Sequence, residues 1–299
     1  MTNSTLTDAQ RRDFEEQGFF VVRGLVAPET MAQVRDAIVN FVENPGDLSS
    51  VLSEEGAVRR GEQREGMARY RKLEKMGRFS PIVWNAYYAN PGVLEIVRQF
   101  IGGDILVKYD SVFLKPARRG GSTPWHQDIG LWRDDNVRAF NAWIAVEPAT
   151  RENGCLQLVP GSHRDGLVEH VLYPDSLHEE LPRDVVARRL REQDVFHAEL
   201  QPGDAVMWQS YLWHYSPPNL SEHSRIGMGA VWTDFAYARR SPQAKEYLWV
   251  MRHGETLPFP PERFEAPGPR VTSYTPQRRD STAAGSHIDS ARVPSVGGY

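Results

Sequence analysis

The chain has 299 residues, of which 40% are hydrophobic and 25% charged, a composition typical of a protein that folds around a buried core. Its formal net charge is −4, so it lacks the basic excess that nucleic acid or an anionic membrane usually requires. Cys155 is the only cysteine, which excludes an internal disulfide and favours a reducing, cytoplasmic location. The polar first twenty residues lack the apolar core of a signal peptide, and no apolar run approaches the roughly 18 residues of a membrane span.

The first hundred residues carry the signals of three helices. Thr7 and Gln10 have the spacing of a capping box, which predicts a short helix. Proline favours the first turn of a helix, so Pro28 and Pro91 mark two more helix starts, each followed by apolar residues at helical spacing. Between these helices, residues 44–71 are charged and aperiodic, which predicts a loop or mobile flap. The predicted elements are a helix over residues 8–17, a strand over 19–22, a helix from 28 that ends before Pro45, and a helix from 91.

From about residue 104 the hydrophobic period changes to two, which is typical of strands. Turns rich in Gly, Pro, Asn and Ser separate the segments ILVKYD, SVFLKP, AFNAWIAVE, CLQLVPG, VFHAELQ, GDAVMWQS and RIGMGAVWTDF. One charged stretch, residues 176–194, interrupts them and is predicted to be a helix on a long connection. Short strands that follow three helices predict a mainly β fold, a barrel or jelly roll with the N-terminal helices packed against it.

The chain shows neither an internal repeat nor a linker between two cores, so we expect one domain over residues 1–260. Beyond about residue 258 the sequence is rich in Pro, Gly, Ser and Arg. This composition predicts an irregular arm or tail over residues 261–299.

A histidine followed two residues later by an acidic residue is a candidate pair of metal ligands. The pattern begins at His126, His163, His178, His197, His253 and His287, so it identifies no site by itself. Placement favours His126 and Asp128, which follow a Gly-Gly-Ser-Thr-Pro turn and lie between two tryptophans. His197 and Glu199, in a predicted strand, remain a weaker alternative. The other four pairs fall in a turn, in the charged helical stretch, before a glycine and in the tail.

A site with two histidines and one carboxylate needs a third ligand from a distant strand. His214 follows a predicted strand and precedes a Pro-Pro-Asn turn, after which Arg225 begins the next strand. We expect a hairpin that brings Arg225 beside His214, where its guanidinium could grip a carboxylate through two hydrogen bonds. A structural ion pair between Arg225 and a nearby acid such as Glu222 is the alternative.

The order of several motifs resembles the phytanoyl-CoA dioxygenase family. These motifs are HQD at residue 126, NGCLQLVPGSH, GDAVMW, WHYSPPN and then Arg225, preceded by an N-terminal LTDAQRRDFEEQGFFVVRGLV. The resemblance covers most of the chain. It implies a double-stranded β-helix (jelly roll, cupin-like) core and an oxygenase that depends on Fe(II), 2-oxoglutarate and O2. It also implies His126, Asp128 and His214 as iron ligands, and Arg225 as the partner of the distal carboxylate of 2-oxoglutarate.

The same resemblance implies further residues around the cosubstrate. Ser216 matches a hydroxyl that helps hold the distal carboxylate, and Trp143 matches a tryptophan of the pocket wall. Lys72 matches an upstream lysine, with Lys75 or Arg71 as alternatives. Family halogenases carry a small residue in place of the carboxylate ligand, so the presence of Asp128 argues against halogenation.

Large apolar residues near the predicted ligands are candidates for the substrate site. They are Trp125, Leu131, Trp132, Tyr211 and Trp213, although residues of this kind also pack the mouth of a barrel. They favour a sizeable, partly apolar small-molecule substrate such as a natural-product intermediate, with an amino acid derivative or an acyl thioester as alternatives. Hydroxylation, desaturation, epimerisation and ring formation all remain open, as does the oligomeric state. Two alternative functions are a redox-silent cupin-type isomerase or lyase and a non-catalytic jelly roll that binds small molecules.

Overall fold

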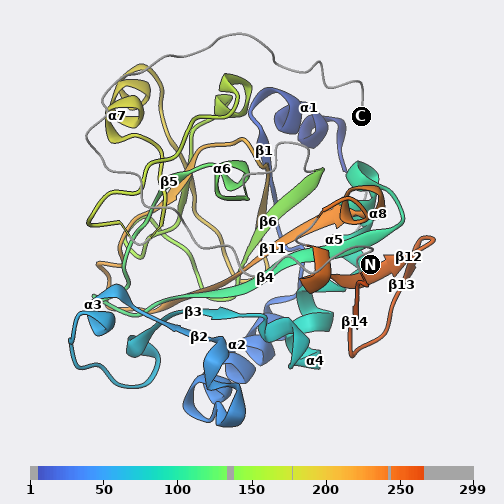
Figure 1. Cartoon of the computed structure of the whole chain (residues 1–299), viewed down its shortest axis with the longest axis horizontal. Coiled ribbons are helices and arrows are strands. Elements are labelled where there is room, and N and C mark those ends of the chain that lie inside the picture. The colour runs from blue at the N-terminus through green and yellow to red at the C-terminus, as the bar shows by residue number, and fades with distance from the viewer. Residues whose placement is uncertain (1–5, 133–137, 177, 242–243, 266–299) are drawn as a thin grey trace.

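The computed structural model describes residues 6–132, 138–176, 178–241 and 244–265. Two antiparallel sheets face one another, and helices cover the outer face of the larger sheet (Figure 1). The larger sheet has the order β1-β9-β6-β11-β4-β12-β13, with β14 beside β12, β3 beside β4 and β2 beside β3. The smaller sheet has the order β5-β10-β7-β8. The predicted mainly β jelly roll with N-terminal helices packed against it is confirmed.

The longest strands, β4 and β11, both belong to the larger sheet. The larger sheet contains β1 (Phe19–Val22), β2 (Leu52–Glu54), β3 (Tyr70–Glu74), β4 (Ile105–Lys115), β6 (Ala139–Ala145), β9 (Ala205–Gln209), β11 (Arg225–Asp234), β12 (Leu248–Arg252), β13 (Glu255–Thr256) and β14 (Glu262–Arg263). The smaller sheet contains β5 (Thr123–His126), β7 (Leu156–Leu158), β8 (Phe196–Ala198) and β10 (His214–Ser216).

The predicted N-terminal helices form where their end signals place them. Thr7 Oγ1 accepts a hydrogen bond from Gln10 N at 3.1 Å, and Gln10 Oε1 accepts one from Thr7 N at 3.0 Å, so the capping box is present. The α-helices are α1 (Asp8–Glu16), α2 (Pro28–Glu43), α3 (Gly56–Arg59), α4 (Pro81–Val83), α5 (Pro91–Ile101), α6 (Asp128–Trp132), α7 (Arg183–Glu192) and α8 (Phe235–Ala238). The 3-10 helices are η1 (Gly46–Val51), η2 (Gly66–Arg69), η3 (Met76–Arg78), η5 (Ser162–Asp165) and η6 (Ala244–Glu246), and η4 (Trp84–Tyr88) is a π-helix.

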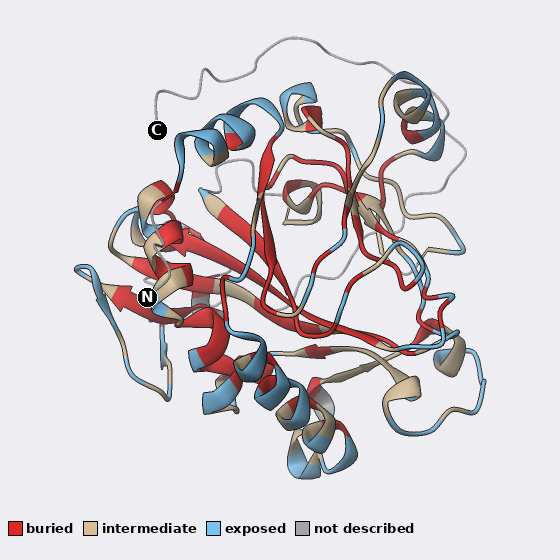
Figure 2. Cartoon of the chain, turned by 180° about the vertical axis from the view of Figure 1, so that it is seen from behind, coloured by how far each residue is buried: buried red, intermediate tan, exposed pale blue. Residues whose placement is uncertain are grey.

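The main hydrophobic core lies between the larger sheet and α2, η4 and α5, and the central strands are the most buried part of the molecule (Figure 2). On β11, Ile226, Met228 and Trp232 belong to this core. Successive side chains of a strand point to opposite faces, so Gly227 and Gly229 face the space between the two sheets. Because this face of β11 carries almost no side chain there, it leaves room for other groups.

The structure corrects two predictions of local structure. Residues 105–115 form the single strand β4, because Asp110 and Ser111 continue its pairing with β11 instead of forming a turn. Residues 44–71 are not simply a loop, since β2 within them pairs with β3.

Two further segments are more ordered or shorter than expected. The helix predicted over residues 176–194 is confined to α7, which starts after Pro182. Residues 262–263 form β14 and pair with β12, and Phe264 is buried, so ordered structure continues past residue 260. The rest of the predicted C-terminal arm, residues 266–299, lies outside the described residues.

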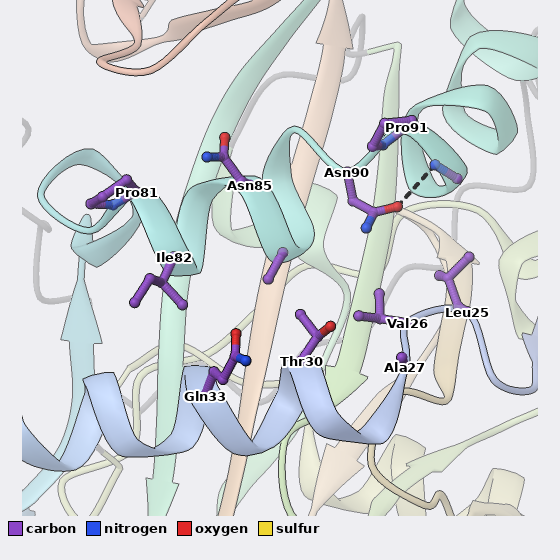
Figure 3. Close-up of a pocket in the computed structure, with 12 residues that line it drawn as sticks. Leu25, Val26, Ala27, Thr30, Gln33, Pro81, Ile82, Asn85, Asn90 and Pro91 are labelled. Carbon is purple, nitrogen blue, oxygen red and sulfur yellow. Dashed lines mark hydrogen bonds between the residues drawn. The ribbon is translucent and has the colours of Figure 1, made fainter.

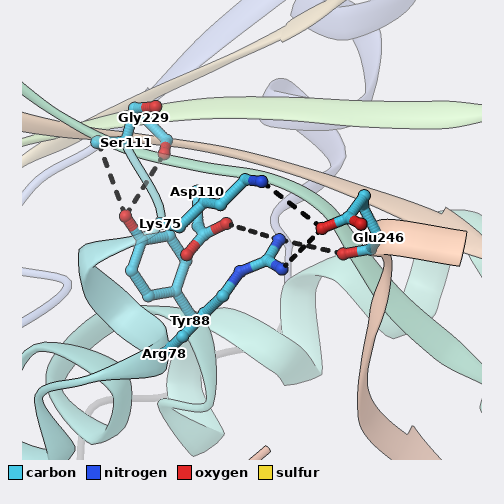
Figure 4. A network of polar contacts seen from close by, with 7 residues as sticks. All are labelled: Lys75, Arg78, Tyr88, Asp110, Ser111, Gly229 and Glu246. Atoms are coloured by element: carbon cyan, nitrogen blue, oxygen red, sulfur yellow. Dashed lines mark hydrogen bonds and ion pairs between the residues drawn. The ribbon is translucent and has the colours of Figure 1, made fainter. Parts of the chain in front are cut away.

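An ionic network with a buried centre, Arg78 and Asp110, joins the helical side of the molecule to the larger sheet (Figure 4). Arg78 Nη2 lies 3.3 Å from Asp110 Oδ1 and donates to the Glu246 backbone carbonyl at 2.9 Å. Burial raises the pKa of Asp110 to about 6, and the nearby Arg78 opposes that rise. The ion pair therefore explains how an acidic residue is tolerated in the middle of β4.

Candidate active site

Strand pairing in the smaller sheet brings the three predicted metal ligands together. His126 is the last residue of β5, Asp128 is the first residue of α6, and His214 is the first residue of β10. In the antiparallel pairing of β10 with β5, His214 lies directly opposite His126. Only Gln127 separates β5 from α6, and the Asp128 side chain faces both histidines.

The three side chains converge on one point. His126 Nε2 lies 3.9 Å and His214 Nε2 3.8 Å from the same oxygen, Asp128 Oδ1. His126 Nδ1 donates to the Pro124 carbonyl at 2.8 Å and His214 Nδ1 to the Leu212 carbonyl at 3.0 Å. A carbonyl can only accept, so these bonds place the proton on Nδ1 and leave each Nε2 lone pair directed at the shared point.

Trp208 of β9 fixes the orientation of the carboxylate. Its Nε1 donates to Asp128 Oδ2 at 2.9 Å, which leaves Oδ1 as the oxygen that faces the histidines. The indole ring also lies 5.2 Å from the His214 ring, centroid to centroid. No local pattern predicts this role, because Trp208 is an ordinary inward residue of an alternating strand on the opposite sheet.

The electrostatics of the three residues suit a divalent cation. Burial raises the pKa of Asp128, which the neighbouring His214 and Trp208 oppose. Burial, followed by the charges of His214 and His178, lowers the pKa of His126. Neutral imidazoles and a carboxylate form the donor set of the two-His-one-carboxylate iron sites. Within the described ranges, this is the one group of three or more His, Cys, Asp or Glu side chains whose ligand atoms lie close enough to hold a metal.

Arg225 provides an unneutralised guanidinium beside the triad. It is only 1% exposed, and its Nη2 donates to Ser216 Oγ at 3.1 Å. Its Nε and Nη1 are buried, and no partner for them is found among the described residues. Burial lowers the pKa of Arg225 to about 10. Buried donors of this kind match the carboxylate of a bound ligand.

Arg225 reaches Ser216 by a different route from the predicted hairpin. Strand β10 pairs with β5 and β7, whereas β11 pairs with β4 and β6, so the connection between them crosses from one sheet to the other. The hairpin prediction is therefore wrong, although the proximity holds. The alternative ion pair with Glu222 is also wrong, because Glu222 pairs with Arg118.

Trp143 lies against Arg225, with the guanidinium carbon 4.9 Å from the ring centroid. A Cβ on Gly227 would lie 1.8 Å from the Trp143 ring, so only glycine lets the indole lie flat on β11. Lys72 faces the same side of the larger sheet; its Nζ lies 3.0 Å from Glu74 Oε1 and 4.6 Å from the centre of the Tyr109 ring. Lys75 pairs with Glu246 on the helical side instead.

The five predicted substrate residues lie in three settings. Leu131 and Trp132 lie on α6 beside Asp128, and the Lys108 ammonium lies 4.5 Å from the centre of the Trp132 ring. Trp213 is buried in an apolar cluster against which Trp125 packs, so packing accounts for both. Tyr211 is placed in the same region by its backbone carbonyl, which accepts from Gln127 Nε2 at 2.8 Å.

Three residues near the triad were not predicted. Gln127 is fully buried and ties the triad to the segment at residues 166–168 through hydrogen bonds to the Gly166 carbonyl and from Val168 N. His170 Nε2 accepts from Gln127 N at 2.9 Å. The His178 ring centre lies 5.5 Å from that of His126, although the sequence pattern predicts a helix remote from the site. His170 and His178 come from the long connection before α7, where no local pattern predicts a position.

The rival metal-ligand pair and a separate cavity both lie elsewhere in the molecule. In the rival pair, Glu199 bonds to Arg151 on the surface. A cavity of about 640 Å³ lies between α2 and the segment at residues 81–92 (Figure 3), and none of its lining residues is a predicted site residue. The predicted triad and Arg225 lie apart from this cavity.

The jelly roll, the convergent triad and the buried arginine together define a non-haem iron dioxygenase that uses 2-oxoglutarate. The chain belongs to the phytanoyl-CoA dioxygenase family, whose model matches residues 14–227. Its cofactor is accordingly Fe(II), with 2-oxoglutarate and O2 as cosubstrates.

Individual relatives agree with this assignment. A probable phytanoyl-CoA dioxygenase of Caenorhabditis elegans is 27% identical over 74% of this chain and 73% of its own length. The ectoine dioxygenase of Bordetella parapertussis is 24% identical over 80% of this chain and 79% of its own. The crystal structure of EctD from S. alaskensis with 2-oxoglutarate and 5-hydroxyectoine has a TM-score of 0.65 at 18% identity, and covers 79% of each chain. At that identity the likeness shows the fold.

Proposed function

We propose that His126, Asp128 and His214 hold the iron, and that Arg225 and Ser216 hold the distal carboxylate of 2-oxoglutarate. The observation that carries this proposal is the shared approach of the two Nε2 atoms to Asp128 Oδ1, at 3.9 and 3.8 Å. A second support is the pair of unpartnered Arg225 donors, which face no carboxylate among the described residues. The redox-silent cupin gives these donors no role, and the non-catalytic jelly roll gives the convergent triad none.

Each protein group has a separate task in the proposed reaction. Arg225 binds and orients the cosubstrate. Ser216 Oγ accepts from Arg225 Nη2 and donates to the Gly154 carbonyl at 2.9 Å; with 2-oxoglutarate bound, the hydroxyl would donate to the distal carboxylate in place of that carbonyl. Trp143 forms a wall that excludes water from this end of the pocket. Trp208 keeps Asp128 Oδ1 directed at the metal position. With Fe(II) bound, the site supplies the oxidation of 2-oxoglutarate by O2 to succinate and CO2, coupled to oxidation of a substrate C–H bond.

The proposed substrate is a small organic molecule, such as a natural-product intermediate, that is hydroxylated or otherwise oxidised. A relative named for ectoine supports a small molecule rather than a macromolecule. Leu131 and Trp132 are the proposed contacts, because α6 presents them beside Asp128. The negative net charge and the single cysteine support a cytoplasmic enzyme that binds neither nucleic acid nor membrane. Among the described residues, no helix is long and apolar enough to cross a bilayer.

The test is anaerobic visible spectroscopy of the Fe(II) protein before and after 2-oxoglutarate is added. We expect a metal-to-ligand charge-transfer band in the wild type and none in His126→Ala. His197→Ala is the matched control, because it removes a histidine from the rival motif and should keep the band. Folded wild-type protein that binds iron but gives no band with 2-oxoglutarate would overturn the proposal.

A further inference from the structure

A second buried cation lies beside Arg225. Lys115, the last residue of β4, is only 5% exposed. It is the direct partner of Arg225 in the antiparallel pairing of β4 with β11, so the two side chains leave the sheet as neighbours on one face. Neither cation forms a salt bridge with an acidic side chain in the described part of the chain. Two like charges at paired positions destabilise a sheet, so the arrangement requires an explanation.

The Lys115 ammonium is held by three backbone carbonyls. Nζ donates to Gly121 O at 2.6 Å, to Ser216 O at 3.2 Å and to Pro217 O. These three bonds use all three hydrogens of an ammonium group and so favour the protonated form. Burial, followed by the charge of Arg225, lowers the pKa of Lys115, and a bound anion would oppose that shift. Two of the acceptors belong to the last residue of β10, Ser216, and to the next residue, Pro217, beside the point where the Ser216 hydroxyl meets Arg225.

The backbone closes around this side chain at two glycines. A Cβ on Gly120 would lie 2.7 Å from Lys115 Cα, and one on Gly154 would lie 2.4 Å from the Pro217 carbonyl oxygen. Gly154 also supplies the carbonyl that accepts from the Ser216 hydroxyl. The lysine, the two glycines and Ser216 thus form one packed unit behind the Arg225 guanidinium.

We propose that Lys115 is a positioning residue for 2-oxoglutarate, an inference that rests on the function proposed above. Through its carbonyl bonds it sets the position of Ser216, and hence of the guanidinium that receives the distal carboxylate. As a second buried positive charge it also favours a ligand with a negative charge at that end. Lys115 therefore increases the preference for a dicarboxylate over a 2-oxo acid of the same length with an apolar end.

The test compares two ligands on anaerobic Fe(II) protein, with the charge-transfer band as the measure of binding. One is 2-oxoglutarate, and the other is 2-oxopentanoate, which has the same chelating end but a methyl group in place of the distal carboxylate. Lys115→Met removes the charge and the three bonds while keeping the length of the side chain. Lys75→Met is the matched control, because Lys75 lies in the exposed ion pair with Glu246.

In Lys115→Met we expect the dissociation constant of 2-oxoglutarate to rise about tenfold or more, since charge-assisted bonds and a buried charge are lost. The constant for 2-oxopentanoate and the affinity for Fe(II) should change by less than about twofold, because both depend on the triad. Lys75→Met should match the wild type for both ligands.

Several outcomes would overturn the proposal. One is an unchanged 2-oxoglutarate affinity in Lys115→Met, and another is an equal loss for both ligands, which would indicate general collapse of the site. If Lys115→Met does not fold, Lys115→Gln takes its place, because its amide keeps a donor but lacks the charge; wild-type discrimination between the ligands in this variant would contradict the proposal. Absence of the band in the wild type would instead reject the function proposed above.

Discussion

The two sheets have different roles in the molecule. In the larger sheet, β4 and β11 have 11 and 10 residues, pair from end to end with one register shift between Val231 and Trp232, and are mostly buried. In the smaller sheet, β10 has three residues and shifts register between His214 and Ser216. The long strands supply buried area, whereas the short ones expose the ends at which ligands and turns can be placed. We therefore expect substitutions in the larger sheet mainly to lower the free energy of unfolding, and substitutions in the smaller sheet mainly to lower activity.

The largest effect should come from removing the carboxylate of the smaller sheet. Asp128→Ala should lower activity by about a thousandfold or more, because loss of the carboxylate weakens Fe(II) binding and changes the charge and coordination of the iron that still binds. The free energy of unfolding of the metal-free protein should fall by no more than about 1–3 kcal/mol, because burial already disfavours the charged Asp128 and the main loss is the acceptor of Trp208 Nε1. Iron content, succinate release and urea unfolding measure these quantities. A large loss of stability would show that the site also supports the fold.

A substitution in the larger sheet should have the opposite pattern. Met228 is fully buried on the helical face of β11, so Met228→Ala should lower the free energy of unfolding by about 2–5 kcal/mol. The folded fraction should bind 2-oxoglutarate with wild-type affinity, because the neighbouring Gly227 faces the site and Met228 does not. Urea unfolding and the charge-transfer titration test this separation. A weaker affinity in the folded variant would contradict the division between the two faces.

The free energy of unfolding should vary with pH because of Asp110, which lies on β4 in the larger sheet. Burial raises the pKa of Asp110 from its ordinary 3.8 to about 6, so the folded state favours the neutral acid. Its contribution to stability is complete below about pH 4 and is lost as the pH rises through about 6. Between these limits the wild type should lose up to about 3 kcal/mol relative to Asp110→Asn, because a tenfold change in proton affinity corresponds to about 1.4 kcal/mol. Parallel stability curves for the two proteins would exclude Asp110 as the titrating group.

The smallest expected effect is on Fe(II) affinity, through the hydrogen bond from Trp208 of the larger sheet to Asp128. Trp208→Phe removes the hydrogen bond to Asp128 Oδ2 and keeps most of the ring, so Fe(II) affinity should fall about 10- to 100-fold. Trp232→Phe is the matched control: its Nε1 bonds to the Tyr88 carbonyl on the helical side, and its loss should leave metal affinity unchanged. Competition with a coloured chelator measures both affinities. Equal affinities in the wild type and Trp208→Phe would remove the proposed orienting role.

Local signals predicted much of the fold. The capping box of Thr7 and the prolines at the starts of α2 and α5 act within a few residues, so the helix starts could be read from the sequence. Asp110 and Ser111 look like turn residues, and only the ion pair with the distant Arg78 explains why β4 continues through them. Such compensation from another element has no local pattern.

The residues of the site also divide into those that sequence motifs predicted and those that they did not. The triad and Arg225 could be predicted because their motifs stand in a recognisable order along the chain. Trp208, His178 and Lys115 could not, because each reaches the site through a sheet crossing or a long connection. The predicted hairpin between His214 and Arg225 failed for that reason, since the distance along the chain did not reveal that the strands belong to different sheets.

The decisive measurement is a crystal structure of the protein with Fe(II) and 2-oxoglutarate, grown without oxygen. We predict iron bonded to His126 Nε2, Asp128 Oδ1 and His214 Nε2, with the distal carboxylate of 2-oxoglutarate on Arg225 and Ser216. Iron bound to a different set of side chains, or a cosubstrate whose distal carboxylate does not contact Arg225, would contradict the proposed function.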